Sequence, residues 1–583
     1  MMLKSVSSRI LQRIENRLHF LYGDQAHGLA NRLYMMIGRY GVGINGHTPA
    51  APGWGEQDVV LITYGDMIHA PEEAPLATLK RVLDERMSGM VNTVHILPFF
   101  PYSSDDGFSV KDYYAVDPAL GTWRDVEHFR DGYALMFDLV INHVSRQSQW
   151  FRDYVSDIAP YRHFFLEMDP ATDLSAVVRP RNLPLLSETQ TRRGKRHVWT
   201  TFSPDQIDLN FANPDVLFEM LDILMWYIAK GARIIRLDAI AFLWKIPGTP
   251  CVHLTQTHEV VKLLRDFIPM IAPEVLLLTE TNVPHEENIS YFGNGDEAHM
   301  VYQFSLPPLL AHGLLTQYAG HVTHWAERLP VLNEDQAFFN FTASHDGVGV
   351  RPLTGLIDDK AFDALIDHVH RMGGRVSFKR NADGTESPYE LNITYFDLLG
   401  ENPAMVTDTQ IARFLSSQAI MLAMRGIPGI YFNSLFGARN DQDGVNRTGQ
   451  SRSINRQKWS ESEWLGMIND PQHHAHRVFA AYQQMLRIRR AHRAFHPSGP
   501  QRVLRILDTL FALERTAPDS SEVILHLTNF AAAPTTIDWP VAGLNWPPAA
   551  SAQDLLTDRV CGLSDGSLTL APYQSVWLTP VSA

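Results

Sequence analysis

Residues 232–239 read ARIIRLDA, an apolar strand-like run that carries the carboxylate Asp238 near its end. Two further acids stand in similar settings: Glu280 closes the apolar run 275–280, VLLLTE, and Asp346 follows the apolar residues 338–341. Each acid lies where a short buried strand would pass into a loop. In a parallel barrel these loops share one face, so the three acids are predicted to converge in space.

Converging carboxylates indicate chemistry at a glycosidic bond. One carboxylate attacks the sugar carbon, a second protonates the leaving oxygen, and a third stabilises the oxocarbenium-like transition state. Arg236 lies two residues before Asp238, so both side chains of a strand would point the same way. A neighbouring guanidinium keeps a carboxylate ionised, which suits a nucleophile. Glu280 must be protonated before it can donate, so its surroundings should raise its pKa.

Apolar runs and helical stretches alternate along the chain, as expected for a parallel sheet. Eight strands are predicted, which is the number in a closed (β/α)8 barrel. The fold class is therefore predicted to be α/β, a TIM barrel with an inserted small domain and a C-terminal antiparallel β domain. The predicted strands cover residues 59–64, 94–98, 135–140, 234–237, 275–278, 300–304, 338–341 and 429–432.

Five segments are predicted. Residues 1–56 form an N-terminal helical extension, because apolar residues at helical spacing are followed by a Gly- and Pro-rich stretch. The catalytic barrel begins at 57–144, is interrupted by an inserted B domain at 145–208, and continues over 209–496. Short alternating runs separated by Pro and Gly predict a β domain over 497–583.

Composition excludes several classes of protein. The 583 residues are 45% hydrophobic, enough for a large core, and a net charge of −14 with scattered basic residues argues against nucleic acid as a partner. Two cysteines, Cys251 and Cys561, exclude a disulfide framework and favour a reducing compartment. Because neither a secretory signal nor a spanning apolar run is evident, a cytoplasmic protein without a membrane partner is predicted. The oligomeric state stays open, with a homodimer as one alternative.

Four ordered segments resemble the hallmark motifs of the α-amylase superfamily, glycoside hydrolase family 13. They are residues 138–143, DLVINH, residues 236–239, RLDA, the acid Glu280 after its apolar strand, and the pair His345 and Asp346. The resemblance covers residues 57–583. It implies a retaining mechanism with Asp238 as nucleophile, Glu280 as general acid/base and Asp346 as transition-state stabiliser. It further implies substrate-binding roles for His143, Arg236 and His345.

Finer matches resemble the sucrose phosphorylase subgroup. Residues 97–108, LPFFPYSSDDGF, look like the segment that holds the terminal glucosyl unit, with Asp105 on its hydroxyls and Phe108 facing the sugar. Arg452 matches a second arginine that grips glucose. Residues 179–184, RPRNLP, resemble a loop whose second arginine, here Arg181, reaches toward phosphate or the acceptor. A guanidinium suits phosphate because it can bind two oxygens at once.

Residues 347–379 depart from the loop with which sucrose phosphorylases bind fructose. Together with residues 387–393, SPYELNI, they look more like the glucosylglycerate phosphorylases, whose acceptor carries a carboxylate. Basic side chains would complement that charge. The basic positions of this segment are Arg351, Arg371, Arg375 and Lys379.

The resemblance favours a retaining phosphorylase that cleaves 2-O-α-D-glucosylglycerate with inorganic phosphate. The product is α-D-glucose 1-phosphate, and the reaction passes through a covalent glucosyl-enzyme.

Three alternatives stay open. The glucoside could be sucrose or glucosylglycerol, and a hydrolase or transglucosidase would let water or a sugar hydroxyl intercept the same intermediate. A barrel that only binds glucosides is the third alternative, although such chains usually lose their acids.

No cofactor is expected beyond phosphate as co-substrate. No metal is expected either: Asn142 is at a position that helps bind calcium in amylases, but acidic company in the insertion is not evident.

Overall fold

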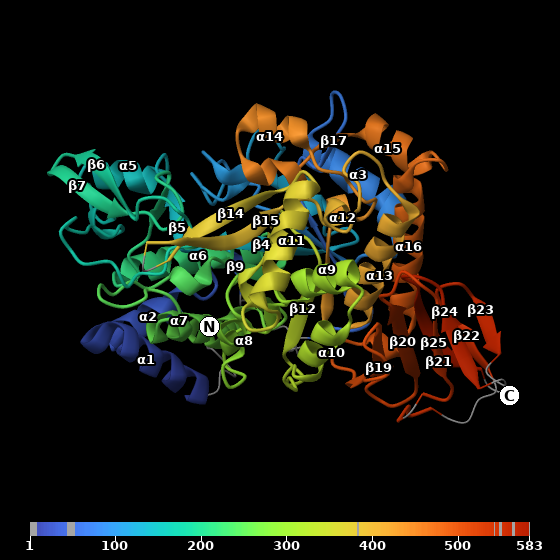
Figure 1. Ribbon diagram of the computed structural model, residues 1–583. Coiled ribbons are helices and arrows are strands. Elements are labelled where there is room, and N and C mark those ends of the chain that lie inside the picture. Colours follow the sequence, from blue (N-terminus) through green and yellow to red (C-terminus); the bar gives the residue numbers. More distant parts are fainter. Residues whose placement is uncertain are drawn as a thin grey trace.

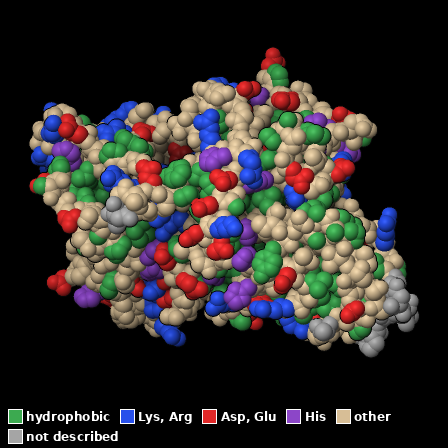
Figure 2. Space-filling model, in the orientation of Figure 1, with side chains coloured by type: hydrophobic (Ala, Val, Ile, Leu, Met, Phe, Trp, Pro, Cys, Tyr) green, Lys and Arg blue, Asp and Glu red, His purple; other side chains and the backbone are tan. Residues whose placement is uncertain are grey.

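The computed structural model describes residues 8–42, 53–381, 384–541, 543–546, 551–562 and 566–581. Figure 1 shows a central barrel, with helices α1 (Ser8–Tyr22) and α2 (Ala26–Met36) on one side and a β domain near the C-terminus on another. On the face in Figure 2, acidic and basic side chains are interspersed. In the part of the chain that is described, no helix is long and apolar enough to cross a membrane.

Eight parallel strands of the described chain close into a barrel, which confirms the predicted α/β fold with a TIM barrel. Each strand pairs with the next barrel strand along the chain, and the last pairs with the first. The strands are β1 (Val60–Thr63), β3 (Thr93–Ile96), β4 (Ala134–Val140), β9 (Ala232–Asp238), β10 (Leu276–Thr279), β11 (Met300–Tyr302), β12 (Ala337–Phe341) and β16 (Ile427–Tyr431).

The barrel strands are apolar because the helices cover one face and the barrel core the other. All residues of β1, β3, β10, β11, β12 and β16 are buried. Gly429 in β16 is needed for packing, since a Cβ atom there would lie 2.3 Å from the ring of Phe339. Side chains of the facing strands thus fill the interior, and a catalytic site can form only at an end of the barrel.

Helices surround the barrel, as Figure 1 shows. Local signals set their ends: α6 begins after Asn213, whose side chain accepts a hydrogen bond from the Asp215 backbone N–H, and Pro214 occupies its first turn. The main helices are α3 (Pro75–Met87), α6 (Pro214–Ala229), α7 (Thr255–Ile271), α9 (Leu306–Thr316), α10 (Gly320–Glu327), α13 (Asp408–Ala423) and α16 (His474–Ala491).

Between β4 and β9 the chain leaves the barrel. Strand β5 (His143–Ser145) pairs with β8 (Gln206–Asp208), so the two ends of this insertion lie together. Between them are helix α5 (Gln149–Val155) and the hairpin β6 (Leu186–Thr191) to β7 (Gly194–Trp199). The insertion therefore enters and leaves the barrel at one point, directly after β4.

A second insertion follows β12, where the sequence suggested only an acceptor loop. It contains β13 (Val348–Gly349), α11 (Asp359–Arg371), β14 (Arg375–Arg380) and β15 (Glu386–Asn392). The three strands form an antiparallel sheet with β15 in the middle. A sheet holds side chains more rigidly than a free loop, so this insertion provides a defined wall beside the barrel end.

Beyond the barrel the described chain forms antiparallel sheets with a small apolar core of their own. Buried Arg515 of β19 joins this domain to the barrel, because its Nη1 donates to the backbone oxygen of Ala423 at 2.6 Å. The larger sheet contains, in order, β18 (Gln501–Leu504), β19 (Leu510–Thr516), β20 (Val523–Asn529), β25 (Ser575–Pro580), β22 (Ser551–Asp554) and β23 (Arg559–Gly562), and β21 (Thr535–Asp538) pairs with β24 (Ser567–Leu570).

The N-terminal helices are anchored to the barrel by charge. Arg17 of α1 donates to Asp266 of α7 at 2.7 Å and to Glu259 at 3.0 Å, and Asp266 is buried. Arg13 donates to the same aspartate at 2.6 Å. Helix α7 follows the strand that carries Asp238, so this anchor stiffens the layer behind that strand.

Replacing Arg17 by Ala is expected to lower the free energy of unfolding by about 2–4 kcal/mol, because the buried carboxylate of Asp266 loses its better shielded partner. Denaturant unfolding would measure the change. Arg32→Ala is the control, since Arg32 and its partner Asp215 are 45% and 41% exposed, and a loss below about 1 kcal/mol is expected there. Equal losses in the two variants would contradict the anchoring role of Arg17.

Candidate active site

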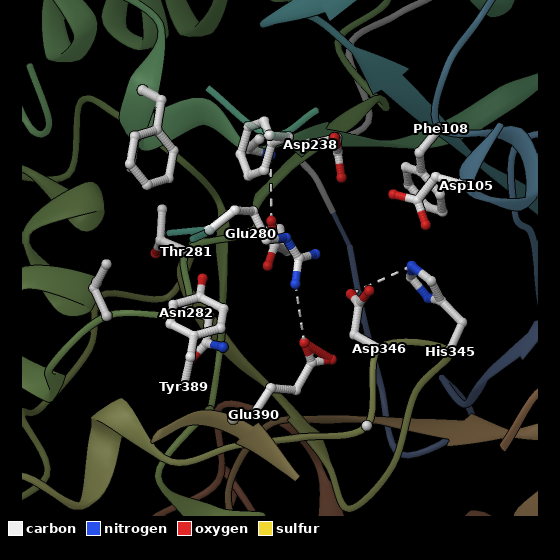
Figure 3. A pocket seen from close by; sticks show the side chains of 18 of the residues that line it. Asp105, Phe108, Asp238, Glu280, Thr281, Asn282, His345, Asp346, Tyr389 and Glu390 are labelled. Atoms are coloured by element: carbon white, nitrogen blue, oxygen red, sulfur yellow. Dashed lines mark hydrogen bonds and ion pairs between the residues drawn. The ribbon is translucent and has the colours of Figure 1, made fainter. Parts of the chain in front are cut away.

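The three acids at the strand ends line one cavity, at the carboxyl end of the barrel. Asp238 is the last residue of β9, Glu280 directly follows β10, and Asp346 lies in the loop after β12. In Figure 3, Glu280 lies between Asp238 and Tyr389. The structure thus brings together side chains that are up to about a hundred residues apart in the sequence.

Arg236 is the cation among these acids. It is buried, and its Nη1 donates to Asp238 Oδ1 at 2.8 Å and also to Asp138 Oδ1. Its Nη2 lies 3.8 Å from Glu280 Oε2. Asp138 in addition accepts a hydrogen bond from His95 Nε2 at 2.6 Å. Asp138 was quoted within the DLVINH motif but not assigned a role, and the structure makes it the second anchor of Arg236.

Burial raises the pKa of both Asp238 and Glu280, and the negative charge of neighbouring carboxylates raises each further. Arg236 opposes the shift at both, but it is closer to Asp238. The pair therefore holds a proton more readily than isolated acids do. Because Arg236 lies closer to Asp238, it favours the ionised form of Asp238, and on this ground we assign the shared proton to Glu280. This is the protonation required of a nucleophile next to a general acid.

Glu280 is oriented by the backbone after the nucleophile position. Ala239 adopts a left-handed conformation with φ of 51°, which is uncommon for a residue with a side chain. Its N–H donates to Glu280 Oε2 at 3.2 Å. The turn costs on the order of 1 kcal/mol, and it leaves the other oxygen, Oε1, to carry the proton.

Asp346 has the opposite electrostatic setting. Burial would raise its pKa, but Arg452, His345 and Arg456 together lower it. Arg452 Nη1 lies 2.7 Å from Asp346 Oδ1, and His345 Nε2 lies 3.3 Å from Oδ2. Asp346 is therefore ionised, as a group that stabilises positive charge must be.

Asp105, Phe108, His143 and His345 line the same cavity. Figure 3 shows Asp105, Phe108 and His345 together on one side of it. The Phe108 and His345 rings stack with centroids 4.7 Å apart. His143 lines the cavity, and its Nε2 donates to the backbone oxygen of Phe108 at 2.9 Å, so its role in binding substrate stays a prediction. His143 thus fixes the position of Phe108.

Arg456 is a site residue that the sequence reasoning missed. It is buried, and its Nη1 donates to Asp106 at 2.7 Å and lies 3.4 Å from Asp105 Oδ1. Its Nε donates to the backbone oxygen of His345 at 2.8 Å. The segment RSINR, residues 452–456, contained this arginine beside Arg452. It holds the Asp105 and His345 segments against each other.

Arg181 reaches the cavity from the first insertion and meets Glu390 from the second. Arg181 Nη1 lies 3.7 Å from Glu390 Oε2, and Arg452 Nη2 donates to the same oxygen at 2.8 Å. Glu390 is buried and its pKa is raised, mainly by burial. Asn182 donates to Glu386, which ties the Arg181 loop to β15. Glu390 lies within the segment SPYELNI, residues 387–393, whose pattern alone indicated no role for it.

Lys245 occupies the neighbourhood of Asn142. Its ammonium group is buried, donates to Asn142 Oδ1 at 2.8 Å and lies 2.7 Å from Asp208 Oδ2. Asp208 lies at the end of the first insertion. Asn142 therefore does have a carboxylate beside it, which the sequence alone did not reveal. Within the described residues, no group of three or more His, Cys, Asp or Glu side chains is placed to hold a metal ion. The positive charge in this position is that of a lysine.

Three comparisons relate the chain to known proteins. Residues 89–346 match the family model for the α-amylase catalytic domain. The chain is 48% identical over 529 residues to a glucosylglycerate phosphorylase of Spirochaeta thermophila, covering 90% of both chains. It is 31% identical over 468 residues to a sucrose phosphorylase of Agrobacterium vitis, covering 76% of this chain and 90% of the other. The crystal structure of sucrose 6F-phosphate phosphorylase from Thermoanaerobacter thermosaccharolyticum superposes with a TM-score of 0.73 at 26% identity, covering 84% and 97%.

Proposed function

The chain belongs to the α-amylase family, and from this premise we propose that it is a retaining phosphorylase of small α-glucosides whose acceptor is glycerate. It transfers the glucosyl unit of 2-O-α-D-glucosylglycerate to inorganic phosphate and forms α-D-glucose 1-phosphate. The observation that carries this proposal is Arg181 in a cavity that already holds Asp238, Glu280 and Asp346. The similarity to a glucosylglycerate phosphorylase over nine tenths of both chains supports the acceptor.

The first step forms a covalent glucosyl-enzyme. Asp238 Oδ1 is held by Arg236, so Oδ2 attacks the anomeric carbon as the bond to the glycerate oxygen breaks. The Glu280 proton moves to that oxygen, and glycerate leaves. Asp346, ionised beside Arg452, stabilises the positive charge that develops on the sugar.

In the second step phosphate attacks from the face that glycerate has left, so the product keeps the α configuration. Glu280, now ionised, accepts a proton from the entering phosphate oxygen. A phosphate dianion would be repelled by the carboxylates of the cavity. Arg181 offsets this repulsion, because its guanidinium can bind two phosphate oxygens at once.

The glucosyl pocket accepts one sugar unit. Asp105, Phe108 and His345 form its inner side, and the Arg456 contacts with Asp106 and with the His345 backbone close it. A longer α-glucan would have to pass through this wall. Small glucosides such as glucosylglycerate fit, and sucrose is the second candidate because sucrose phosphorylases are also related to the chain.

We further propose that inorganic phosphate is the one co-substrate and that no organic cofactor takes part. The two cysteines, Cys251 and Cys561, are both free thiols, which suits a reducing compartment such as the cytoplasm. A homodimer remains part of the proposal and can be tested by sedimentation.

Incubation with glucosylglycerate, sucrose or glucosylglycerol tests the activity. With phosphate, glucosylglycerate should release α-D-glucose 1-phosphate at least about tenfold faster than the other two, since a missing ionic contact costs about 1.4 kcal/mol or more. Product release would be followed by an enzyme-coupled assay. Free glucose at equal rates with and without phosphate would instead indicate a hydrolase.

Replacing Arg181 by Ala should lower kcat/KM for phosphate by about 100-fold or more, because two charge-assisted hydrogen bonds are lost. Hydrolysis of the glucosyl-enzyme by water should change far less. The control is Arg192→Ala, an exposed arginine on the hairpin of the same insertion. A parallel loss of hydrolysis and phosphorolysis in the Arg181 variant would contradict the assigned role.

The shared proton predicts a bell-shaped pH profile for glucosylglycerate cleavage. At low pH Asp238 becomes protonated and cannot attack, whereas at high pH Glu280 loses the proton that the leaving oxygen needs. Because the pKa of Glu280 is raised, the alkaline limb should lie above the usual range of a glutamate. With α-glucosyl fluoride, whose leaving group needs no proton, that limb should disappear. Its persistence would assign it to another group.

A further inference from the structure

Two cations flank the outer wall of the cavity, on either side of strand β15. Arg351 begins the 3-10 turn that follows β13, and Lys379 lies in β14. The register fixes their places: Gly349 pairs with Glu390, and Lys379 pairs with Ser387. Both long side chains therefore project from backbone that borders residues 387–390, the stretch that supplies the wall.

Neither cation has a close ion-pair or hydrogen-bond partner in the part of the chain that the structure describes. No carboxylate lies within 4.0 Å of Arg351 or Lys379 there, and neither side chain makes a hydrogen bond. Burial lowers the pKa of Lys379, and the charge of Arg351 lowers it further. The carboxylate of Glu287 acts in the opposite direction, but it lies beyond ion-pair distance of Lys379. Two half-buried like charges with no carboxylate within ion-pair distance repel each other, and such pairs are typical of sites that bind anions.

Tyr389 connects this pair to the cavity. It lines the cavity, and the backbone N–H of Val350, next to Arg351, donates to its carbonyl oxygen at 3.1 Å. Burial raises the pKa of Tyr389 to about 12, while the charges of Arg351 and Arg181 act against the rise. Figure 3 shows Tyr389 beside Asn282, on the side of Glu280 away from Asp105, Phe108 and His345. This is the side on which the leaving group must lie.

We propose that Arg351 and Lys379 form an oxyanion-binding site at the outer wall of the cavity, which draws the carboxylate of the acceptor or inorganic phosphate toward Tyr389 and Arg181. The inference rests on the proposed function, in which glucosylglycerate, glycerate, phosphate and glucose 1-phosphate are all anions. The chain has a net charge of −14, so its average field repels them. A local pair of cations reverses that field where the substrates enter.

The other basic side chains of this insertion lie elsewhere. Arg371, at the end of α11, lines a separate cavity together with His312, His368 and Arg413. Arg375 is exposed at the opposite end of β14 from Lys379, where it pairs with Asn392. Of the four basic positions predicted to complement the acceptor, Arg351 and Lys379 thus lie beside the part of β15 that supplies Tyr389 and Glu390 to the cavity.

The test compares the wild type with Arg351→Met, Lys379→Met and the double variant. Each is given α-glucosyl fluoride, a neutral donor, and one of three acceptors: glycerate, glycerol or phosphate. The double variant should show a rise of about tenfold or more in KM for glycerate, phosphate or both, with kcat little changed. Glycerol, which has the same carbon chain without the charge, should be unaffected. Whether glycerate, phosphate or both respond identifies the anion.

Added salt provides a second readout. The wild-type kcat/KM for the responding anion should fall as salt screens the two cations, and the double variant should lose that dependence. Arg375→Met removes the same charge from an exposed position of β14 and is the matched control. Lys379→Arg should keep the wild-type KM for the responding anion, because the positive charge is retained. The melting temperature of the double variant should not fall, since the substitutions relieve a repulsion.

Three outcomes would overturn the site: unchanged KM for both anions, an equal rise in KM for glycerol, or an equal effect of Arg375→Met. These are distinct from a failure of the proposed function. A wild-type protein that forms no glucose 1-phosphate from any glucoside refutes the phosphorylase, whereas an active wild type with unaffected variants refutes only the role of Arg351 and Lys379.

Discussion

One buried guanidinium, that of Arg236, makes the rest of the site physically feasible. It binds Asp138 and Asp238 and lies near Glu280, so three largely buried carboxylates share one cation. Carboxylates this close repel each other strongly at low dielectric. Arg236 favours the ionised forms of its two hydrogen-bonded partners, Asp138 and Asp238, so the repulsion is relieved by the proton that we assign to Glu280. The division of labour between nucleophile and acid follows from where this cation sits.

A second line of charges extends outward from the barrel. Asp346 pairs with Arg452, Arg452 with Glu390, and Glu390 lies 3.7 Å from Arg181. The line crosses from the barrel into both insertions, so it connects Asp346 to Arg181, the arginine proposed to receive phosphate. Arg181 and Glu390 thus reach the cavity from the insertions, whereas Asp238 and Glu280 reach it from the ends of barrel strands.

Sequence reasoning located the barrel strands and the residues at their ends, because burial on both faces leaves apolar runs that end in isolated acids. It did not find roles for Asp138, Arg456 or Glu390. Each of these acts on a partner that is remote in sequence: Asp138 on Arg236, Arg456 on Asp106, and Glu390 on Arg452. Local patterns carry no information about such pairs. The second insertion was likewise expected as a loop, because its short strands are too polar to resemble the barrel strands.

The sequence by itself determined the order of strands and helices, the acids at the strand ends, and the family to which the motifs point. These depend on periodicity and on local spacing, which are preserved when the chain is unfolded. The tertiary structure decided which charges meet. It set Arg236 between Asp138 and Asp238, and it placed His143 in hydrogen-bond contact with the Phe108 backbone. Lys245 contacts Asn142 and Asp208. Arg351 and Lys379 have no carboxylate within 4.0 Å in the described chain. Electrostatic pairing depends on distance in space, and only the folded chain defines that distance.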